Sequence, residues 1–588
     1  MRVLLIHPED GLQAAPWSSR KWDRVIDLGT SGHQDYDRVA RRFGCAITRL
    51  AEFRVDFQEM RRVRELISLG LNLLNDQFGL DWWELTSIEI HQRFEIAFLM
   101  GELAKTLGPG DEVWVSRPGF HADVLRRPLG SRLRTFAPAG ARRQGRFTRY
   151  LRAARKFPVA QLQEIFWDKA DPGYRLRGRF SSRPRPQTGS VVLLPTCYVN
   201  VTRTAAAYAQ ILPDARFLLV TTRPSGWTKN LPANVSATWL RRYASAQVRS
   251  RTAEYRDLMA GWNRLRSELN AVPEFRVLSE LGSFDAVVPQ LAVGLDIRDA
   301  WLNVLDSEPV SAVICADDSN PFTHIPLLLA RARKLPAIAC HHGALDGRYM
   351  FKRSHADVLL AKGKMEEDYL VRQCGVPREV VEVGAPARPE RSQSFPPAAG
   401  KSAIVFFSEA YEVSGGRTRS FYEDVLPPLA DLALAEAKTL VVKLHPSEST
   451  AERKRFLSEV LTPAQMARVK IVQGTLSHEL LDDAWFAVTV MSTVAVECAM
   501  QSVPCFLCAW LEAWPYGYVA QFGRFGVGIR LDHREQIREI PAFLSRYPIN
   551  IRVAENCWEP ISPRRLSTLL GMDPSVKHPQ NEVVTRIA

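Results

Sequence analysis

The sequence has 588 residues, of which 46% are hydrophobic and 24% charged. This balance is typical of a globular protein and excludes collagen-like, coiled-coil and wholly disordered chains. At about 150 residues per domain, the length favours two large domains with insertions. No uncharged apolar stretch approaches the ~18 residues of a membrane-spanning helix, and the apolar run after Arg2 is too short for a signal peptide. Any membrane association is therefore expected to be peripheral.

Positive charge is concentrated in one segment. The chain has 77 Lys or Arg against 64 Asp or Glu, a net charge of +13. Residues 117–190 contain 18 Lys or Arg and four acidic residues, so the local net charge of +14 accounts for the whole excess. Such a segment attracts polyanions: nucleic acid, an anionic membrane surface, or an acidic glycan or lipid phosphate. The alternative is a solvated Arg-rich face or a partly mobile insertion.

The cysteines favour a reducing compartment. There are nine, an odd number, scattered through predicted strands and helices, so a disulfide framework is not expected and the cytoplasm is favoured. Cys505 and Cys508 form a lone CxxC within an apolar run. Because no second pair accompanies them, we interpret them as strand core instead of a metal or redox site.

The N-terminal part of the chain mixes strands with a helical region and the basic segment. Strands are predicted at 2–6, 112–116, 190–194 and 216–221. The region 53–107 is predicted to be helical. The segment 117–190 is rich in Pro, Gly and Arg and is expected to be an insertion with one helix near 148–156.

From residue 310 onward, strands alternate regularly with helices, which is typical of parallel, doubly wound sheets. A stretch rich in Pro, Ala and Ser at 385–401 is expected to be an interdomain linker. Before it, the pattern predicts strands at 311–316, 336–340, 357–361 and 380–384, with helices at 323–334 and 364–374. After it, the pattern predicts strands at 403–407, 439–444, 469–472, 486–490 and 504–508, with helices at 421–436, 451–460, 477–484 and 494–500.

Ligands of open α/β sheets bind at the carboxyl ends of the strands, so residues that follow a strand are the first candidates. Ser408 follows one strand of the second series. Ser492 and Thr493 lie where a strand turns into a helix, so their hydroxyls could face a phosphate. Glu497, one helical turn further, could accept both hydroxyls of a ribose. The alternative is a plain Ser-Thr helix cap and a solvent-facing glutamate.

His445 ends another of these strands, and Pro446 fixes the backbone that follows it. Lys443 lies two residues earlier, on the same side of the strand as His445. An imidazole at this position could donate to a phosphate oxygen or protonate a leaving group. A structural histidine at a strand end is the alternative.

These motifs together resemble a known enzyme family. KLHPSE at 443–448, followed by STVAVECAM at 492–500 and Pro504, resembles the paired His-Pro and Ser-Ser/Thr motifs of bacterial GT-B glycosyltransferases. The stretch from CHHGALDG to GAPARPE at 340–390 is similar to the end of the N-terminal domain of capsule and teichoic-acid polymerases. Relatives of this kind include capsule Kdo transferases, polysialyltransferases and CDP-glycerol transferases. Cys498, and a Val where a Gly usually precedes Pro504, depart from the pattern.

The resemblance implies roles for particular residues. His445, Pro446, Ser492 and Thr493 would hold the nucleotide phosphate and sugar, often of a cytidine nucleotide, and Glu497 would contact the ribose. The first domain would supply the acceptor side and the catalytic base. Its candidates for the base are Glu9 and Asp10, which resemble the acidic motif of polysialyltransferases, and His342 in the HHG loop. Asp317 and Asp318 could bind acceptor hydroxyls or cap the helix that begins near Thr323. An ordinary polar turn is the alternative for Glu9 and Asp10.

The predicted fold is thus α/β and GT-B-like, with two Rossmann-like, doubly wound domains facing a cleft. Residues 1–390 form the acceptor-side domain, including the helical region 53–107 and the basic insertion 117–190, and 391–588 form the nucleotide-sugar-binding domain. Lys443, His445 and the Ser492–Thr493 turn would stabilise the departing nucleotide without a metal or another cofactor.

The predicted activity is transfer of a sugar, CMP-linked by preference, to a bacterial capsule or surface polysaccharide or its lipid-linked primer. The basic segment would hold the polyanionic acceptor or the inner face of the cell membrane, so the protein is expected in the cytoplasm or peripherally on that membrane. Two alternatives stay open. One is a CDP-alditol phosphotransferase, and the other is a nucleic-acid-binding protein that uses the Arg-rich segment; no nucleic-acid partner is expected, because stacking aromatics are sparse there.

Overall fold

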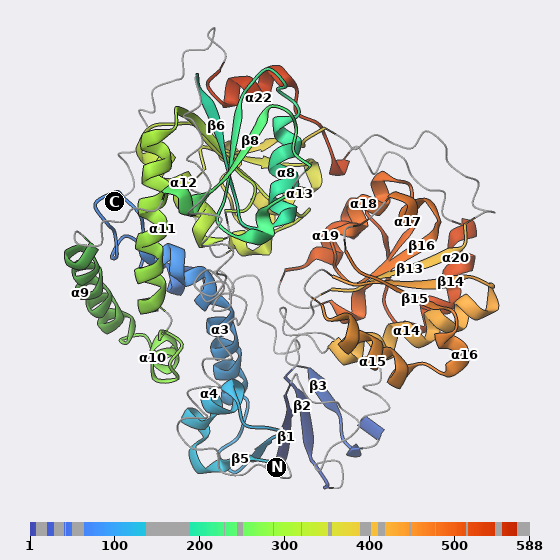
Figure 1. Ribbon diagram of the computed structural model, residues 1–588. Coiled ribbons are helices and arrows are strands. Elements are labelled where there is room, and N and C mark those ends of the chain that lie inside the picture. Colours follow the sequence, from blue (N-terminus) through green and yellow to red (C-terminus); the bar gives the residue numbers. More distant parts are fainter. Residues whose placement is uncertain are drawn as a thin grey trace. The chain divides into compact units, whose positions relative to one another are not determined.

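The computed structural model describes residues 1–7, 20–28, 40–49, 64–136, 189–243, 251–387, 401–409, 418–546 and 556–572, apart from short gaps inside these ranges. The chain divides into two compact units. One contains 1–63, 93–142 and 390–557, and the other 64–92, 143–389 and 558–588. Three parallel sheets form the framework (Figure 1). The prediction of an α/β fold with doubly wound parallel sheets is therefore confirmed, with one sheet more than the two that were expected.

The first sheet is built from the N-terminal 135 residues. Its order is β3-β2-β1-β4-β5, and every neighbouring pair is parallel. The strands are β1 (Arg2–Ile6), β2 (Arg24–Asp27), β3 (Ile47–Arg49), β4 (Glu112–Val115) and β5 (Leu133–Thr135). Residues 3–6 of β1 have no exposed surface because the strand is central. The sequence predicted β1 and β4 but placed them in one sheet with the strands that follow residue 190.

The start of the basic insertion was predicted wrongly. Residues 117–136 are not an insertion but a helix and a strand of the first sheet, α4 (Phe120–Leu129) followed by β5. The helix buries one apolar face that includes Val124 and Leu125, and β5 pairs with β4. The arginines of this stretch hid the pattern, because they lie on the exposed side of an amphipathic helix. The predicted helix near 148–156 lies outside the described residues.

The predicted helical region contains one long helix. Its described part includes α3 (Trp82–Lys105). Trp83 is fully buried and stacks on Trp262 of α9 (Arg251–Leu269), with ring centroids 6.3 Å apart. Arg298 of α11 (Val287–Ser307) is also buried, and its guanidinium lies 2.9 Å from Asp76 and 2.5 Å from Glu254. This ion-paired arginine joins the loop before α3 to helices that come 200 residues later.

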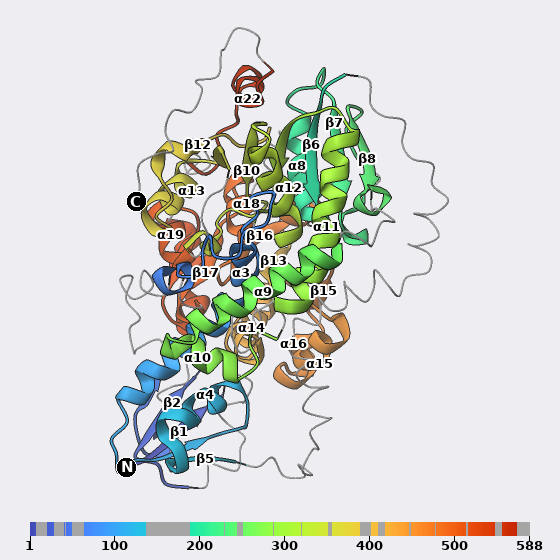
Figure 2. The same ribbon diagram turned by 90° about the vertical axis from the view of Figure 1, so that its left-hand side faces the viewer.

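The second sheet has seven parallel strands in the order β12-β11-β10-β9-β6-β7-β8. The strands are β6 (Val191–Thr196), β7 (Phe217–Thr221), β8 (Val235–Trp239), β9 (Val310–Cys315), β10 (Ala337–Cys340), β11 (Val358–Ala361) and β12 (Val381–Val383). Helices α8 (Val199–Ala209) and α12 (Pro321–Ala332) pack on it (Figure 2). The sequence predicted all of these strands except β8, an edge strand that is only partly buried.

The C-terminal segment completes the core of this second sheet. Leu566 and Leu570, in and just after α22 (Pro563–Leu569), are buried in one hydrophobic cluster with Val192 of β6 and Ile338 of β10. The backbone N–H of Ala385 donates to the carbonyl of Glu559, 2.8 Å away. Residues 558–572 thus pack in the unit of the second sheet, an arrangement that the sequence did not predict.

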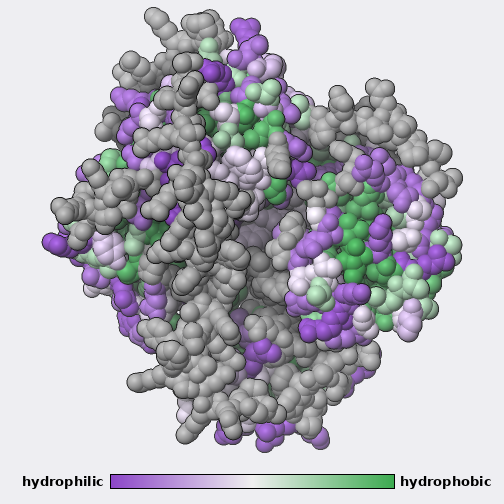
Figure 3. Space-filling view, viewed as in Figure 1, coloured by the Kyte–Doolittle hydropathy of each residue, from purple (hydrophilic) through white to green (hydrophobic). Residues whose placement is uncertain are grey.

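The third sheet has six parallel strands in the order β15-β14-β13-β16-β17-β18. The strands are β13 (Ala403–Phe407), β14 (Thr439–Lys443), β15 (Val469–Val472), β16 (Ala484–Thr489), β17 (Cys505–Cys508) and β18 (Ile529–Leu531). Five of them were predicted to within two residues. Cys505 and Cys508 are free and buried, which confirms that they are strand core. Figure 3 shows the surface of the region around the third sheet, at the right of the view, where hydrophobic residues gather in one area bordered by hydrophilic ones.

Candidate functional site

All three sheets share one strand order. If the strands of each sheet are numbered in the order of the chain, every sheet contains, from one edge inward, its third, second, first, fourth and fifth strands. The direction of winding therefore reverses between the first and fourth strands. Ligands of doubly wound sheets bind outside the carboxyl ends of the strands at this switch point. In each sheet a polar residue after the first strand contacts the residues after the fourth, and these contacts define the candidate sites.

In the third sheet, Glu409 bridges the switch point. Its Oε1 accepts a hydrogen bond from the Thr489 hydroxyl at 3.0 Å and one from the backbone N–H of Met491 at 2.9 Å. Burial raises the pKa of Glu409 to about 7, although the N–H groups that face it act in the opposite direction. Sequence reasoning noted this strand end but selected the neighbouring Ser408. An acidic residue directly after the central strand was the signal for Glu409.

Ser408 is buried, and its hydroxyl makes internal hydrogen bonds. It donates to Oε1 of Glu448 at 2.8 Å and lies 3.0 Å from the Tyr422 hydroxyl. These contacts indicate that Ser408 positions Glu448. Its predicted contact with a donor nucleotide stays a prediction.

Glu448 holds the loop that carries His445. Its Oε2 accepts from the backbone N–H of His445 at 2.7 Å, and its Oε1 accepts from Nε of Arg453 at 2.8 Å. Both Glu448 and Arg453 are buried, so this is a desolvated ion pair. The His445 backbone is thus fixed by a carboxylate three residues further on. Sequence reasoning quoted Glu448 within KLHPSE but gave it no role.

Lys443 and His445 differ in exposure. The Lys443 ammonium is buried and donates to the carbonyl of Gly474 at 2.6 Å. Burial lowers its pKa, while the charges of Glu448 and Glu497 oppose that shift. The His445 side chain is exposed; partial desolvation lowers its pKa, Glu448 acts against this, and Lys443 adds to it. Pro446 lies outside the described residues.

Ser492, Thr493 and Glu497 flank the same edge. Ser492 Oγ accepts from the backbone N–H of Val494 at 3.3 Å, at the start of α18 (Val494–Met500). Thr493 occupies the cap position without a capping bond from its side chain. Glu497 is exposed, and its charge acts on Lys443. Lys443 and Glu497 thus lie at the same edge of the third sheet although they are 54 positions apart in the sequence, and their contacts with a nucleotide stay a prediction.

In the second sheet, Tyr198 and Asp317 bridge the switch point. The Tyr198 hydroxyl follows β6 and donates to Oδ2 of Asp317, which follows β9, at 3.0 Å. It also lies 3.1 Å from Nε2 of His342, and the two rings meet edge to face with centroids 5.2 Å apart. Burial lowers the pKa of His342 to about 4, against the charge of Asp317. His342 is therefore a neutral imidazole at physiological pH.

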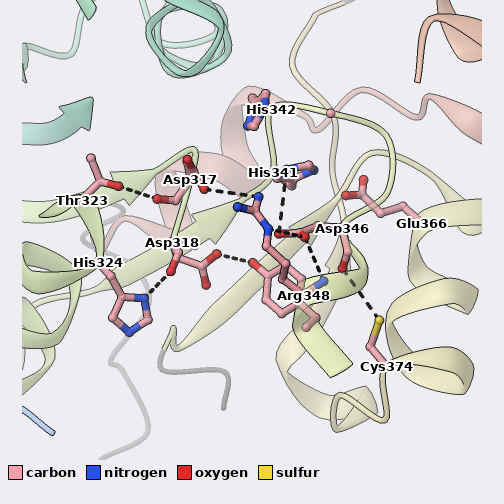
Figure 4. A network of polar contacts seen from close by, with 12 residues as sticks. Asp317, Asp318, Thr323, His324, His341, His342, Asp346, Arg348, Glu366 and Cys374 are labelled. Carbon is pink, nitrogen blue, oxygen red and sulfur yellow. Dashed lines mark hydrogen bonds and ion pairs between the residues drawn. The ribbon is translucent and has the colours of Figure 1, made fainter. Parts of the chain in front are cut away.

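Arg348 joins the two loops behind His342. Figure 4 shows its guanidinium between Asp317 and Asp346. Nε of Arg348 donates to Oδ1 of Asp346 at 2.9 Å, and a terminal nitrogen lies 3.9 Å from Asp317. His341 is buried 3.8 Å from Asp346, and burial holds its pKa well below the usual range. Tyr198, Asp346 and Arg348 were missed, because no local motif marks them.

Asp318, the residue after Asp317, is also buried. Its Oδ1 accepts from the Tyr349 hydroxyl at 2.6 Å, and its carbonyl lies 2.6 Å from Nδ1 of His324. The cap of α12 is Asn320, whose side chain accepts from the N–H of Phe322 at 3.0 Å. The proposed alternative that Asp317 and Asp318 cap this helix is therefore wrong. Asp317 faces Tyr198 instead.

The first sheet shows only part of its predicted site. The backbone N–H of His7, after β1, donates to the hydroxyl of Ser116, after β4, at 2.8 Å. The His7 ring packs edge to face on His121, 4.9 Å away. Glu9 and Asp10 lie outside the described residues, so their predicted role as a base stays a prediction. Within the described ranges, no group of three or more His, Cys, Asp or Glu side chains is arranged to hold a metal ion.

Residues 335–509 match the model of a protein family described as "Putative glycosyltransferase (DUF6716)". The matched stretch contains β10, β11 and β12 of the second sheet and β13 to β17 of the third. It therefore includes His342, Lys443, Glu448 and Glu497. The prediction of an enzyme of the glycosyltransferase class is confirmed at this level. No curated protein matches the chain.

Solved structures give weaker likenesses. UDP-GlcNAc 2-epimerase of Methanocaldococcus jannaschii, in complex with UDP-GlcNAc and UDP, is 12% identical with a TM-score of 0.40, covering 66% of this chain and 100% of that one. CalG4, the calicheamicin glycosyltransferase, is 15% identical with a TM-score of 0.36, covering 66% and 94%. A glycosyltransferase from Rickettsia africae ESF-5 is 9% identical with a TM-score of 0.35, covering 65% and 93%. At these scores the likeness carries no conclusion about activity.

Of the helices that the structure describes, none combines the length and the apolar composition needed to cross a membrane.

Proposed function

We propose that the protein is a glycosyltransferase that moves a sugar from a CMP-linked donor to a bacterial capsule or surface polysaccharide, or to its lipid-linked primer. The observation that carries the proposal is the family match over residues 335–509, because this stretch contains the strand-end residues of two sheets. The motifs at 443–448 and 492–500, which resemble cytidine-nucleotide sites, support the choice of donor.

The third sheet would bind the donor. Lys443 places a buried positive charge at the end of β14, where it can compensate the phosphate of a nucleotide. His445 and Pro446 would contact that phosphate, and Ser492 and Thr493 would add their hydroxyls. The exposed carboxylate of Glu497 would accept the ribose hydroxyls. Glu448 and Glu409 would act indirectly, because their carboxylates hold the two loops that carry these residues.

The second sheet would supply the base. His342 is neutral above a pH of about 4 and is therefore free to accept a proton, although its lowered pKa makes it a weaker base than an ordinary histidine. The proton of the acceptor hydroxyl would pass to His342 while the acceptor oxygen forms a bond to the anomeric carbon. The bond between that carbon and the nucleotide phosphate would break, and CMP would leave with the electron pair. Tyr198 and Asp317 would fix the His342 ring during this displacement.

The basic segment 117–190 would bind the acceptor or the inner membrane face. Its arginines would attract a polyanionic glycan or anionic lipid at about 1 kcal/mol for each residue near the surface. This role fits a cytoplasmic protein that associates peripherally with the membrane. Most of the segment lies outside the described residues, so the proposal rests on its charge alone.

Isothermal titration of the purified chain with CMP, CDP, UMP and UDP tests the donor site. We expect selective binding of cytidine nucleotides, with at least tenfold weaker binding in His445→Ala and Glu497→Ala. Glu459→Ala, which removes an exposed glutamate from α15 (Thr450–Val460), is the matched control and should bind like the wild type. Binding of UDP alone would reject the CMP donor, and binding of no nucleotide would reject the enzymatic proposal.

The same protein preparation separates the alternatives. Consumption of CDP-glycerol without consumption of a CMP-sugar would identify a CDP-alditol phosphotransferase. Strongly salt-dependent RNA binding without nucleotide binding would indicate a nucleic-acid-binding protein.

A further inference from the structure

Two stacked tryptophans lie at one end of the second sheet. Trp227 follows a 3₁₀ turn, Pro224–Gly226, that comes after β7. Its ring stacks on that of Trp239, the last residue of β8, with centroids 4.8 Å apart and an interplanar angle of 8°. Trp227 is nevertheless 40% exposed, and it is one of five large hydrophobic residues that are exposed in the described part of the chain. Because Trp239 covers one face of the ring, the remaining face and edge are available to a ligand.

The segment before Trp227 is seated firmly on the end of β6. The Ser225 hydroxyl donates to the carbonyl of Cys197 at 2.9 Å, and the Thr202 hydroxyl donates to the carbonyl of Gly226 at 2.6 Å. A Cβ atom at Gly226 would lie 2.4 Å from the Thr221 hydroxyl and 3.1 Å from the backbone of Cys197. Only glycine permits so close an approach. The exposed ring is therefore held by a rigid turn.

This turn joins the stacked pair to the end of β6, next to Tyr198. Ser225 is hydrogen-bonded to the carbonyl of Cys197, which directly precedes Tyr198. The Tyr198 hydroxyl contacts Asp317 and His342. Strands β6, β7 and β8 are consecutive neighbours in the sheet. At a spacing of about 4.8 Å between strands, the end of β8 lies roughly 10 Å from the end of β6. A ligand that extends along the carboxyl edge of this sheet can thus reach both places.

We propose that Trp227, supported by Trp239, is the platform on which a sugar ring of the acceptor glycan stacks. The C–H face of a sugar is apolar and carries a partial positive charge, so it packs on the negative face of an indole. A rigid aromatic ring gives this contact at a small cost in conformational entropy. Because the proposed acceptor is a chain of sugars, one of its sugar rings can stack on Trp227 while the hydroxyl of another sugar reacts near His342. The assignment rests on the proposed glycosyl transfer, in which the nucleotide belongs to the third sheet.

The test uses the full chain labelled with 5-fluorotryptophan. The chain has 14 tryptophans, and the ¹⁹F resonance of Trp227 is identified by its loss in Trp227→Phe. Chitohexaose, maltohexaose and hexagalacturonate are the probes at millimolar concentration, and CMP and UMP are added separately. We expect at least one oligosaccharide to shift the Trp227 resonance, because stacking on a ring face tolerates different substituents.

The variants then measure the contribution of the ring. Isothermal titration, which does not need the Trp227 resonance, should show that oligosaccharide bound about tenfold more weakly by Trp227→Ala, the magnitude expected for one stacked ring, and less than threefold more weakly by Trp227→Phe. Leu434→Ala is the control, since Leu434 is 38% exposed on α14 (Thr418–Ala435) of the third sheet. It should bind as the wild type does.

Three results would overturn the platform. The first is that none of the oligosaccharides shifts the Trp227 resonance, and the second is that a nucleotide shifts it instead. The third is that Trp227→Ala binds the oligosaccharide with unchanged affinity. A shift caused by anionic phosphatidylglycerol vesicles in place of sugars would show a membrane contact and also reject the proposal. These outcomes are independent of the nucleotide titration, so the platform and the glycosyl transfer can fail separately.

Discussion

Glu409 accepts a hydrogen bond from the backbone N–H of Met491, 2.9 Å away, across the switch point of the third sheet. A carboxylate of the chain itself thus occupies donors of the loop that leads to Ser492 and Thr493. The loop is held in place before any ligand arrives. A donor phosphate would meet an ordered turn and would have to rely on the hydroxyls and on Lys443.

Glu409 makes stability depend on pH. Its pKa is raised from an ordinary 4.5 to about 7, so the folded state binds this proton more tightly than the unfolded state. The resulting stabilisation is complete below pH 4.5 and is lost as the pH rises to about 7, by at most about 3 kcal/mol. Glu409→Gln should lack this decline, whereas Glu459→Gln should retain it. Urea unfolding across this pH range measures the difference, and parallel curves for wild type and Glu409→Gln would contradict it.

His342 should determine the acid limb of the rate profile. Because its pKa is lowered to about 4, the base is neutral above that pH and kcat should fall only as the pH approaches 4. His342→Gln should lower kcat by roughly 10²-fold or more, and the donor KM should stay unchanged. An acid limb near the ordinary histidine pKa of 6.5 would exclude His342 as the base.

Tyr198 should act through His342. Tyr198→Phe removes the hydroxyl that lies 3.0 Å from Asp317 and 3.1 Å from His342, so kcat should drop about tenfold while the donor KM is retained. Tyr243→Phe is the matched control, because its hydroxyl makes a comparable 2.6 Å bond to Glu308 elsewhere in the same unit. Equal losses in both variants would indicate a general effect on folding instead.

Glu448 should govern nucleotide affinity. Glu448→Gln keeps an acceptor for the His445 N–H but gives up the charge that pairs with Arg453, and we expect CMP to bind about tenfold more weakly. Titration calorimetry gives the affinity, and circular dichroism checks the fold. Glu459→Gln, an exposed change on α15 that does not touch Arg453, serves as the reference. Wild-type affinity in Glu448→Gln would show that the His445 loop needs no such support.

Arg298 should be among the most sensitive positions for stability. Arg298→Ala leaves Asp76 and Glu254 without their cation, and an uncompensated buried charge costs about 3–5 kcal/mol. Arg264→Ala, on the exposed side of α9, should change the free energy of unfolding by less than about 0.5 kcal/mol. Chemical unfolding compares the two, and similar stabilities would mean that Arg298 is solvated.

Strands with continuous apolar sequence could be predicted from the sequence. β13 was predicted at its observed bounds, since a buried parallel strand carries an unbroken apolar run. β15 was also predicted at its bounds, although it is an edge strand whose apolar residues are interrupted by Lys470. β2, β3 and β8 were missed. β2 and β3 have only four and three residues, and the burial of the edge strand β8 is interrupted at Ser236 and Ala237.

The partners of the site residues could not be predicted in the same way. Ser408, Lys443 and His342 were identified because strand ends are local features. Tyr198 became a candidate only once β6 was known to lie next to β9, over a hundred residues later. Strand order depends on the packing of all the helices, so a residue such as Arg348, which joins two loops by its charge, leaves no pattern in the sequence around it.

The return of α22 has a consequence for biosynthesis. Leu566 and Leu570 fill the core of the second sheet, yet a ribosome adds them after every strand of the third sheet. During translation, the third sheet can close as soon as β18 has emerged, whereas the second sheet keeps part of its apolar surface open until α22 leaves the exit tunnel. A nascent chain stalled before residue 558 would therefore be a substrate for chaperones, because residues 558–572 complete a core begun near residue 190.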